Sequence, residues 1–75
     1  GKSRRAEIVE ARQISIYLCR DILGSSLASI GMHFSGRDHT TVLHACKVID
    51  KKKSKDKRIS GIISDIKSEL SIVLA

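Results

Sequence analysis

Residues 26–49 read SLASIGMHFSGRDHTTVLHACKVI, in which two apolar repeats of helical spacing flank a break at Gly36. Apolar side chains that recur at steps of three and four residues predict amphipathic helices, here over residues 26–34 and 38–52. Their inward positions are Leu27, Ile30 and Phe34 in the shorter helix and Val42, Ala45, Cys46 and Ile49 in the longer one. A short helix, a tight turn and a longer helix together predict a helix-turn-helix.

The start of each helix carries a residue suited to capping it. Ser25 or Ser26 can cap the shorter helix and Asp38 the longer one, because their side-chain oxygens accept hydrogen bonds from backbone N–H groups of the first turn. Gly31 stands inside the shorter helix, where glycine costs about 1 kcal/mol relative to alanine. We therefore expect a packing reason for it, such as the close approach of another helix.

Two further helices are predicted on either side of this unit, over residues 8–23 and 59–74. Gly24 is expected to end the first of them as a C-cap glycine. The charged residues 51–58 are expected to form a solvated connection, with contact to phosphate as the alternative. The apolar stripes are Ala11, Ile14, Tyr17, Leu18 and Ile22 in the first helix and Ile59, Ile62, Ile63, Ile66, Leu70 and Val73 in the second, which we expect to close the core.

The predicted fold is all-α, a small Trp-repressor-like domain of about four helices that contains the helix-turn-helix. We expect a single domain over residues 1–75, with a basic arm or linker at 1–7 and a helical core at 8–74. A chain of 75 residues is long enough for one small domain and no more. Because it begins at Gly1 rather than methionine, we expect it to be part of a longer protein.

The charge balance favours a nucleic-acid partner. Lys and Arg number 14 and Asp and Glu number 8, which gives a formal charge of +6. The pI is about 9.8, and a domain pI above about 9 is typical of nucleic-acid binders. Tyr17 and Phe34 are the only aromatic residues, too few for the stacking platforms that bind single strands. Double-stranded DNA is therefore the favoured partner.

The second helix of a helix-turn-helix enters the major groove, and its N-terminal residues touch base edges. Here these are Asp38, His39, Thr40 and Thr41, which offer donors, acceptors and an apolar contact for a thymine methyl. Asp38 can serve as the N-cap, as a base reader, or as both. The outward face of this helix is basic and hydroxyl-bearing, without an acid, and comprises Thr40, His44, Lys47 and Lys51.

The cysteine and histidine positions do not favour metal binding or catalysis. Cys19 and Cys46 lack zinc-site spacing, and we expect both to be buried and reduced. His39 and His44 are five residues apart and do not share a helix face. Because no nucleophile–base pair, carboxylate pair or membrane-spanning run stands out, we expect no enzyme activity, metal or membrane contact from this chain.

A resemblance to a known family rests on residues 36–45, GRDHTTVLHA. They resemble the signature of the C-terminal DNA-binding domain, domain IV, of bacterial chromosomal replication initiators of the DnaA family. Residues 11–13 and 17–20 are similar to the family's first helix. The resemblance covers about residues 2–49, and after Lys51 only a helix is shared. The family's second helix is matched at Ser26, Leu27, Ile30, Gly31 and Phe34.

This resemblance implies binding of the asymmetric, AT-rich DnaA box, of the TTATNCACA type, at the replication origin, where the initiator starts chromosome replication. It implies base reading by Arg4, with Arg5 as the neighbouring candidate, from an arm in the minor groove, and by Leu27, Asp38, His39, Thr40 and Thr41. It implies phosphate contacts from Arg12, Gln13, Arg20, Arg37 and His44, to which charge and position add Arg5 and Lys47. ATP, Mg²⁺ and contacts with other initiator subunits would belong to an AAA+ domain outside this chain, in a cytoplasmic, nucleoid-associated protein.

Two positions depart from the family pattern. Ala28 stands where proline is frequent, which affects a local apolar contact, and Ser35 stands where glycine is usual, although Gly36 still permits the bend.

Two other functions stay open: a helix-turn-helix transcription regulator with a different target site, and a basic helical module that docks an acidic protein. The second fits less well, because a docking face needs Lys and Arg rather than a block of Asp, His and Thr.

Overall fold

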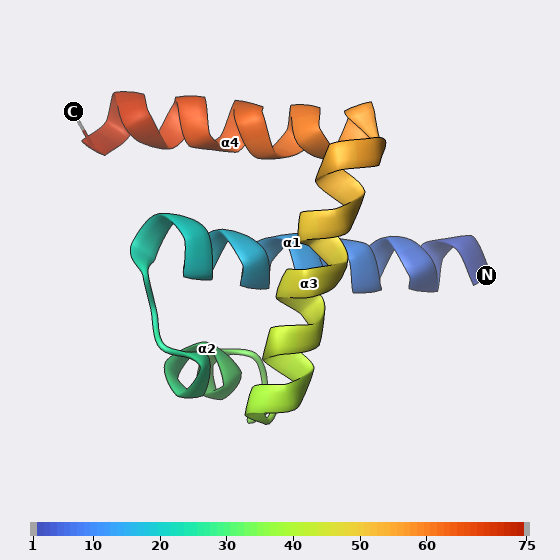
Figure 1. Ribbon diagram of the computed structural model, residues 1–75, viewed down its shortest axis with the longest axis vertical. Helices are drawn as coiled ribbons and strands as arrows, with labels where there is room; N and C mark the ends of the chain where they lie inside the picture. The colour runs from blue at the N-terminus through green and yellow to red at the C-terminus, as the bar shows by residue number, and fades with distance from the viewer. Residues whose placement is uncertain (1, 75) are drawn as a thin grey trace.

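The structure is a computed structural model that describes the backbone of residues 2–74 and the side chains of residues 4–73. This part of the chain is helical throughout apart from short connections, and it contains no strand. The all-α prediction is therefore confirmed (Figure 1). The four helices are α1 Lys2–Leu23, α2 Leu27–His33, α3 His39–Lys55 and α4 Lys57–Leu74.

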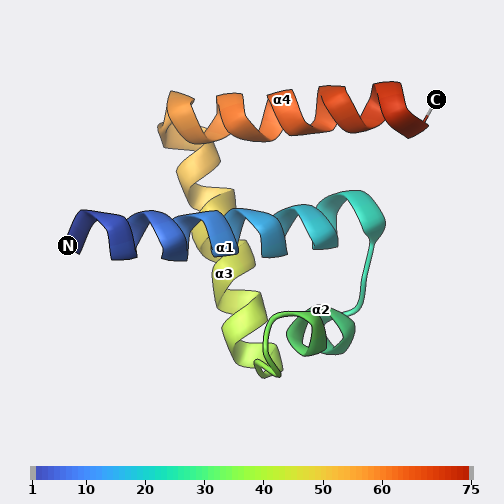
Figure 2. The same cartoon turned by 180° about the vertical axis from the view of Figure 1, so that it is seen from behind.

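Helices α1 and α3 cross steeply at the centre of the fold, with α4 beyond one end of α3 and α2 beside the other (Figures 1 and 2). Two hydrophobic clusters hold this arrangement. The first joins α1, α3 and α4 and comprises Ile14, Tyr17, Leu18, Ile49, Ile59 and Ile63. The second joins α1, α2 and α3 and comprises Ile16, Ile30, Val42 and Ala45. Because α3 contributes to both clusters, its direction relative to α1 and α2 is fixed.

The turn between α2 and α3 is packed directly against Gly31. The backbone N–H of Arg37 donates to the carbonyl oxygen of Gly31 at 2.9 Å. A Cβ on Gly31 would overlap the carbonyl oxygen of Arg37, so the expected packing reason is confirmed, with the turn rather than a helix as the neighbour. Ser35 and Gly36 make the bend with φ of 65° and 68°, in the left-handed region that favours glycine.

The predicted helix ends between α1 and α3 are confirmed. Gly24 has φ of 64° directly after the last residue of α1. The side chain of Ser26 accepts a hydrogen bond from the backbone N–H of Ser29 at 3.1 Å and so caps α2.

Two predicted boundaries are wrong. Helix α1 begins at Lys2, so the arm expected over residues 1–7 is helical where the structure describes it. Residues 51–58 do not form a loop, because α3 continues to Lys55 and the single residue Asp56 separates it from α4. Lys, Arg, Ala and Glu are good helix formers, but these stretches lack the apolar rhythm from which helices were predicted.

The predicted apolar stripes include two residues that are exposed and leave out one that is buried. Ala11 is exposed on α1. Val73 is 78% exposed, where α4 runs past its last core contacts. Ile16 lies outside the predicted stripe, yet it is 1% exposed and belongs to the second cluster. Helix α1 buries a second face because α2 and α3 pack there, which one stripe cannot indicate.

Candidate nucleic-acid interface

The N-terminus of α3 presents four exposed side chains together. Asp38, His39, Thr40 and Thr41 are all exposed. Asp38 has extended backbone geometry, and its Oδ1 accepts a hydrogen bond from the backbone N–H of Thr41 at 2.8 Å. The N-cap role of Asp38 is therefore confirmed, and its role in base reading stays a prediction. The Asp38 side chain is exposed, and a carboxylate has about four lone-pair sites, so acceptor capacity remains for a base donor.

The capping hydrogen bond also sets the charge of this end of the helix. The backbone N–H of Thr41 is the main cause that lowers the pKa of Asp38 below its ordinary value of 3.8. Asp38 is therefore ionised at neutral pH. An ionised Asp is an acceptor only, which suits the amino group of cytosine, a donor in the major groove. Together with a neighbouring side chain that donates, it can also contact a base edge that presents both a donor and an acceptor.

The outward face of α3 continues from Thr40 through His44 and Lys47, all of which are exposed. These residues recur at steps of four and three, so they share the helix face opposite the buried Val42 and Ala45. This confirms the predicted inward and outward faces of the helix. A groove-facing helix needs such a polar, sterically free face along its length.

The candidate phosphate contacts lie on both flanks of α3. Arg5 and Gln13 of α1 line one surface hollow with Lys52 of α3. Arg20 of α1 lines another hollow with Lys47, on the opposite flank of α3. The major groove is bordered by a phosphate backbone on each side, so cations on both flanks match the two strands.

Two of the predicted phosphate contacts also hold the connections of the motif. Arg20 donates through Nη1 to the carbonyl oxygen of Ser25 at 2.8 Å, which ties α1 to the start of α2. A guanidinium has five N–H donors, so others stay free for phosphate. Arg37 is half-buried in the turn, and its buried Nε has no hydrogen-bond partner among the described residues.

The remaining predicted contacts are placed differently. Arg4 is exposed on the first turns of α1 rather than on an extended arm. Leu27 is half-buried and packs against the second cluster, so at least part of its side chain serves the core. Arg12 is half-buried on α1.

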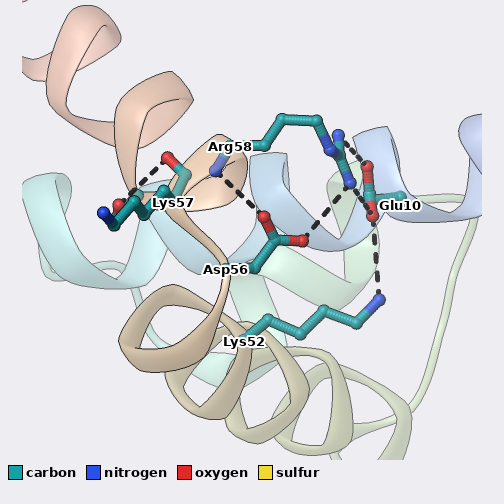
Figure 3. Close-up of polar contacts among 6 residues, drawn as sticks. Glu10, Lys52, Asp56, Lys57 and Arg58 are labelled. Atoms are coloured by element: carbon teal, nitrogen blue, oxygen red, sulfur yellow. Dashed lines mark hydrogen bonds and ion pairs between the residues drawn. The ribbon is translucent and has the colours of Figure 1, made fainter.

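A cluster that sequence reasoning missed joins α1 to the junction of α3 and α4 (Figure 3). Arg58 donates two hydrogen bonds to the carboxylate of Glu10, at 2.8 Å and 2.9 Å. Lys52 lies 3.7 Å from the same carboxylate, and Asp56 pairs with Arg58. The hydrogen bond from Arg58 is the main cause that lowers the pKa of Glu10 below 4.5, against the opposing effect of burial. No local sequence signal could reveal this, because Glu10 and Arg58 are 48 residues apart.

The described residues hold no cluster of three or more His, Cys, Asp or Glu side chains that could bind a metal ion. Cys19 and Cys46 are free thiols that are half-buried against the second cluster. Burial raises the pKa of the Cys46 thiol, and the charge of Arg20 offsets this only in part. Within the described range, none of the helices combines the length and apolar character needed to cross a membrane.

Residues 1–49 match the family described as "Bacterial dnaA protein helix-turn-helix". Curated relatives named "Chromosomal replication initiator protein DnaA" are similar to the chain. The protein of Chlorobaculum tepidum is 42% identical over 73 residues, 97% of this chain. That of Lactobacillus johnsonii is 46% identical over 70 residues, 93% of this chain, and that of Thermodesulfovibrio yellowstonii is 45% identical over 66 residues, 88%.

The chain spans 15% of the length of each of these three relatives. The similarity continues past residue 49, where only a shared helix was expected. No solved structure is similar to the chain.

Proposed function

The chain belongs to the helix-turn-helix family of bacterial DnaA proteins, and on this basis we propose that it binds one AT-rich DnaA box in double-stranded DNA. The N-terminus of α3 enters the major groove of a box of the TTATNCACA type. Binding at such boxes brings a replication initiator to the chromosomal origin. A single asymmetric box requires only one copy of the domain.

The observation that carries this proposal is the exposed block at the start of α3. Asp38, His39, Thr40 and Thr41 are exposed together on a helix end whose backbone is fixed by the Asp38 cap. A fixed helix end limits the entropy lost when these side chains meet base edges. Their carboxylate, imidazole and hydroxyl groups can discriminate base pairs in the major groove, where each pair presents a distinct pattern.

Affinity in this proposal comes mainly from phosphate contacts. Arg5, Arg12 and Gln13 approach one strand, and Arg20 and Lys47 approach the other. Arg37 and His44 add contacts close to the base-reading end, and Arg4 approaches the minor groove from the start of α1. Such contacts are independent of sequence and sensitive to salt.

Other activities of the relatives would lie in parts of those proteins that this chain does not match. We place ATP and Mg²⁺ binding, ATP hydrolysis and contacts with other initiator subunits there, in a cytoplasmic, nucleoid-associated protein. The chain itself then acts as a DNA-binding module without catalysis. Docking of an acidic protein is not favoured, because the family match and the Asp-His-Thr block both support DNA.

Fluorescence anisotropy with two labelled duplexes at physiological salt tests the proposal. One duplex carries TTATCCACA, and the other carries the same bases scrambled. We expect a preference of about a thousandfold or more for the box, the low end of specific-to-non-specific ratios. Equal, salt-sensitive binding to both duplexes would contradict box reading, and binding to neither would contradict DNA binding altogether.

A further inference from the structure

Five of the six basic residues within 51–58, all except Lys57, divide into two sets according to the direction in which each side chain points. Lys52 and Arg58 are engaged by Glu10. Lys53 donates to the hydroxyl oxygen of Tyr17 at 2.7 Å and pairs with Asp50. These cations link helices of the same chain, so they are poorly placed to neutralise an external anion.

Lys51 and Lys55 form the other set. Both are exposed, and neither side chain makes a hydrogen bond or ion pair with another residue that the structure describes. With Lys47 they form a row, here named the lysine stripe, at spacings of four residues along α3. The stripe continues the outward face of Thr40 and His44, so it lies on the side of α3 opposite the core.

This arrangement is unfavourable for the free chain. Like charges at i and i+4 on a helix repel each other and destabilise it. The stripe contains two such pairs, Lys47 with Lys51 and Lys51 with Lys55. Carboxylates occur nearby at Asp50 and Asp56, but they face other groups of the chain. A row of phosphates would relieve this repulsion.

Resting on the proposed function, we infer that α3 lies lengthwise along the major groove and that Lys51 and Lys55 contact backbone phosphates toward and beyond one end of the box. Thr40 and Lys55 are about 22 Å apart along the helix axis, at about 1.5 Å per residue. A nine-base-pair box is about 31 Å long, at about 3.4 Å per base pair. With Thr40 near the middle of the box, the distance to Lys55 exceeds the half-length of the box, about 15 Å at about 3.4 Å per base pair, so the end of the stripe reaches the DNA that flanks the box. End-on insertion of α3 would instead hold these lysines well away from the duplex.

Single substitutions that each remove one positive charge test this inference. Lys51→Gln and Lys55→Gln each remove one charge from the stripe. Lys57→Gln is the matched control, since Lys57 is exposed on α4, off the stripe and apart from the Glu10 cluster (Figure 3). Binding to the box is measured from low to physiological salt, on a duplex of about 25 base pairs and on a duplex that ends at the box. Circular dichroism confirms that each variant is folded.

We expect Lys51→Gln and Lys55→Gln each to lower the slope of log affinity against log salt by about one on the long duplex. Affinity there should fall several-fold, with a smaller loss on the short duplex, whereas Lys57→Gln should leave the slope unchanged. If box preference persists, either of two results would overturn the lengthwise contact. One is that Lys51→Gln and Lys55→Gln have the same slope as the unsubstituted chain, and the other is that Lys57→Gln loses as much affinity as they do. Loss of box preference in the unsubstituted chain would instead overturn the proposed function.

Discussion

The carboxylate of Asp38 accepts a hydrogen bond from the backbone N–H of Thr41 at 2.8 Å, and both residues are exposed at the first turn of α3. One oxygen of Asp38 accepts this capping hydrogen bond, and the exposed carboxylate keeps further acceptor sites. The same residue can fix the helix end and present an acceptor to a base. Structure and recognition at this position are therefore separable by substitution.

Replacing Asp38 in two ways separates these roles. Asp38→Asn keeps a good N-cap, because Asn and Asp cap helices about equally well, whereas Asp38→Ala removes it. We expect Asp38→Asn to retain the melting temperature but to weaken binding to the box, because an amide replaces an ionised acceptor. Asp38→Ala should lower both. Unchanged box affinity for a folded Asp38→Asn chain would confine Asp38 to the capping role.

Gly31 and Gly61 provide a matched pair of helical glycines. In Gly31→Ala the new methyl group meets the backbone carbonyl of Arg37, which cannot move without shifting the turn. We expect a net loss of about 1–3 kcal/mol in the free energy of unfolding, typical of overpacking. Gly61→Ala meets nothing within 4 Å, so helix propensity should stabilise the chain by up to about 1 kcal/mol. Urea denaturation measures both, and a stabilising Gly31→Ala would contradict the close packing of the turn.

The Glu10 cluster should couple stability to DNA binding. Glu10→Gln removes the acceptor shared by Arg58 and Lys52 and frees both cations. We expect a loss of up to about 1 kcal/mol in the free energy of unfolding, the upper range for partly exposed pairs. Binding to scrambled duplex should become tighter, because the released Lys52 and Arg58 can then contact phosphates. Glu69→Gln, on exposed α4 surface, is the charge-matched control.

The pH dependence of this cluster has a definite sign. Because the pKa of Glu10 is lowered in the folded chain, the folded chain binds fewer protons at this residue than the unfolded chain does at acidic pH. Its stabilisation is therefore fully present above its ordinary pKa of 4.5 and is lost as pH falls through the lowered value. The stability difference between the unsubstituted chain and Glu10→Gln should shrink over that acidic range. A difference that stays constant there would show that the ion pair contributes nothing.

Local signals in the sequence were sufficient to predict the helix-turn-helix. Apolar spacing gave the inward face of α3, and residue type gave the caps at Ser26 and Asp38. What could not be predicted depends on partners far apart in the chain. Ile16 is buried because two helices close over a second face of α1, and Glu10 matters because Arg58 folds back onto it.

The residue types of the candidate site could be predicted from the sequence, but the positions of several of its residues in the fold could not. The exposed block at the start of α3 lies where the pattern placed it. Arg4 was expected on a flexible arm, yet it lies on a helix whose first turn has charged residues instead of an apolar rhythm. Residues 51–58 were expected to act together as one solvated run, yet helix geometry directs Lys51 and Lys55 outward, whereas Lys52 and Lys53 contact side chains of α1.

Thr40→Ala, measured on the box and on the scrambled duplex at one salt concentration, tests base reading by the start of α3 most directly. Thr40 is exposed, makes no side-chain hydrogen bond with the described residues and carries no charge, so its loss should leave folding and phosphate attraction intact. We predict a loss of about 1–3 kcal/mol on the box, the usual cost of one lost base contact, and almost none on the scrambled duplex. Equal loss on both duplexes, or no loss on either, would contradict recognition of bases by this end of the helix.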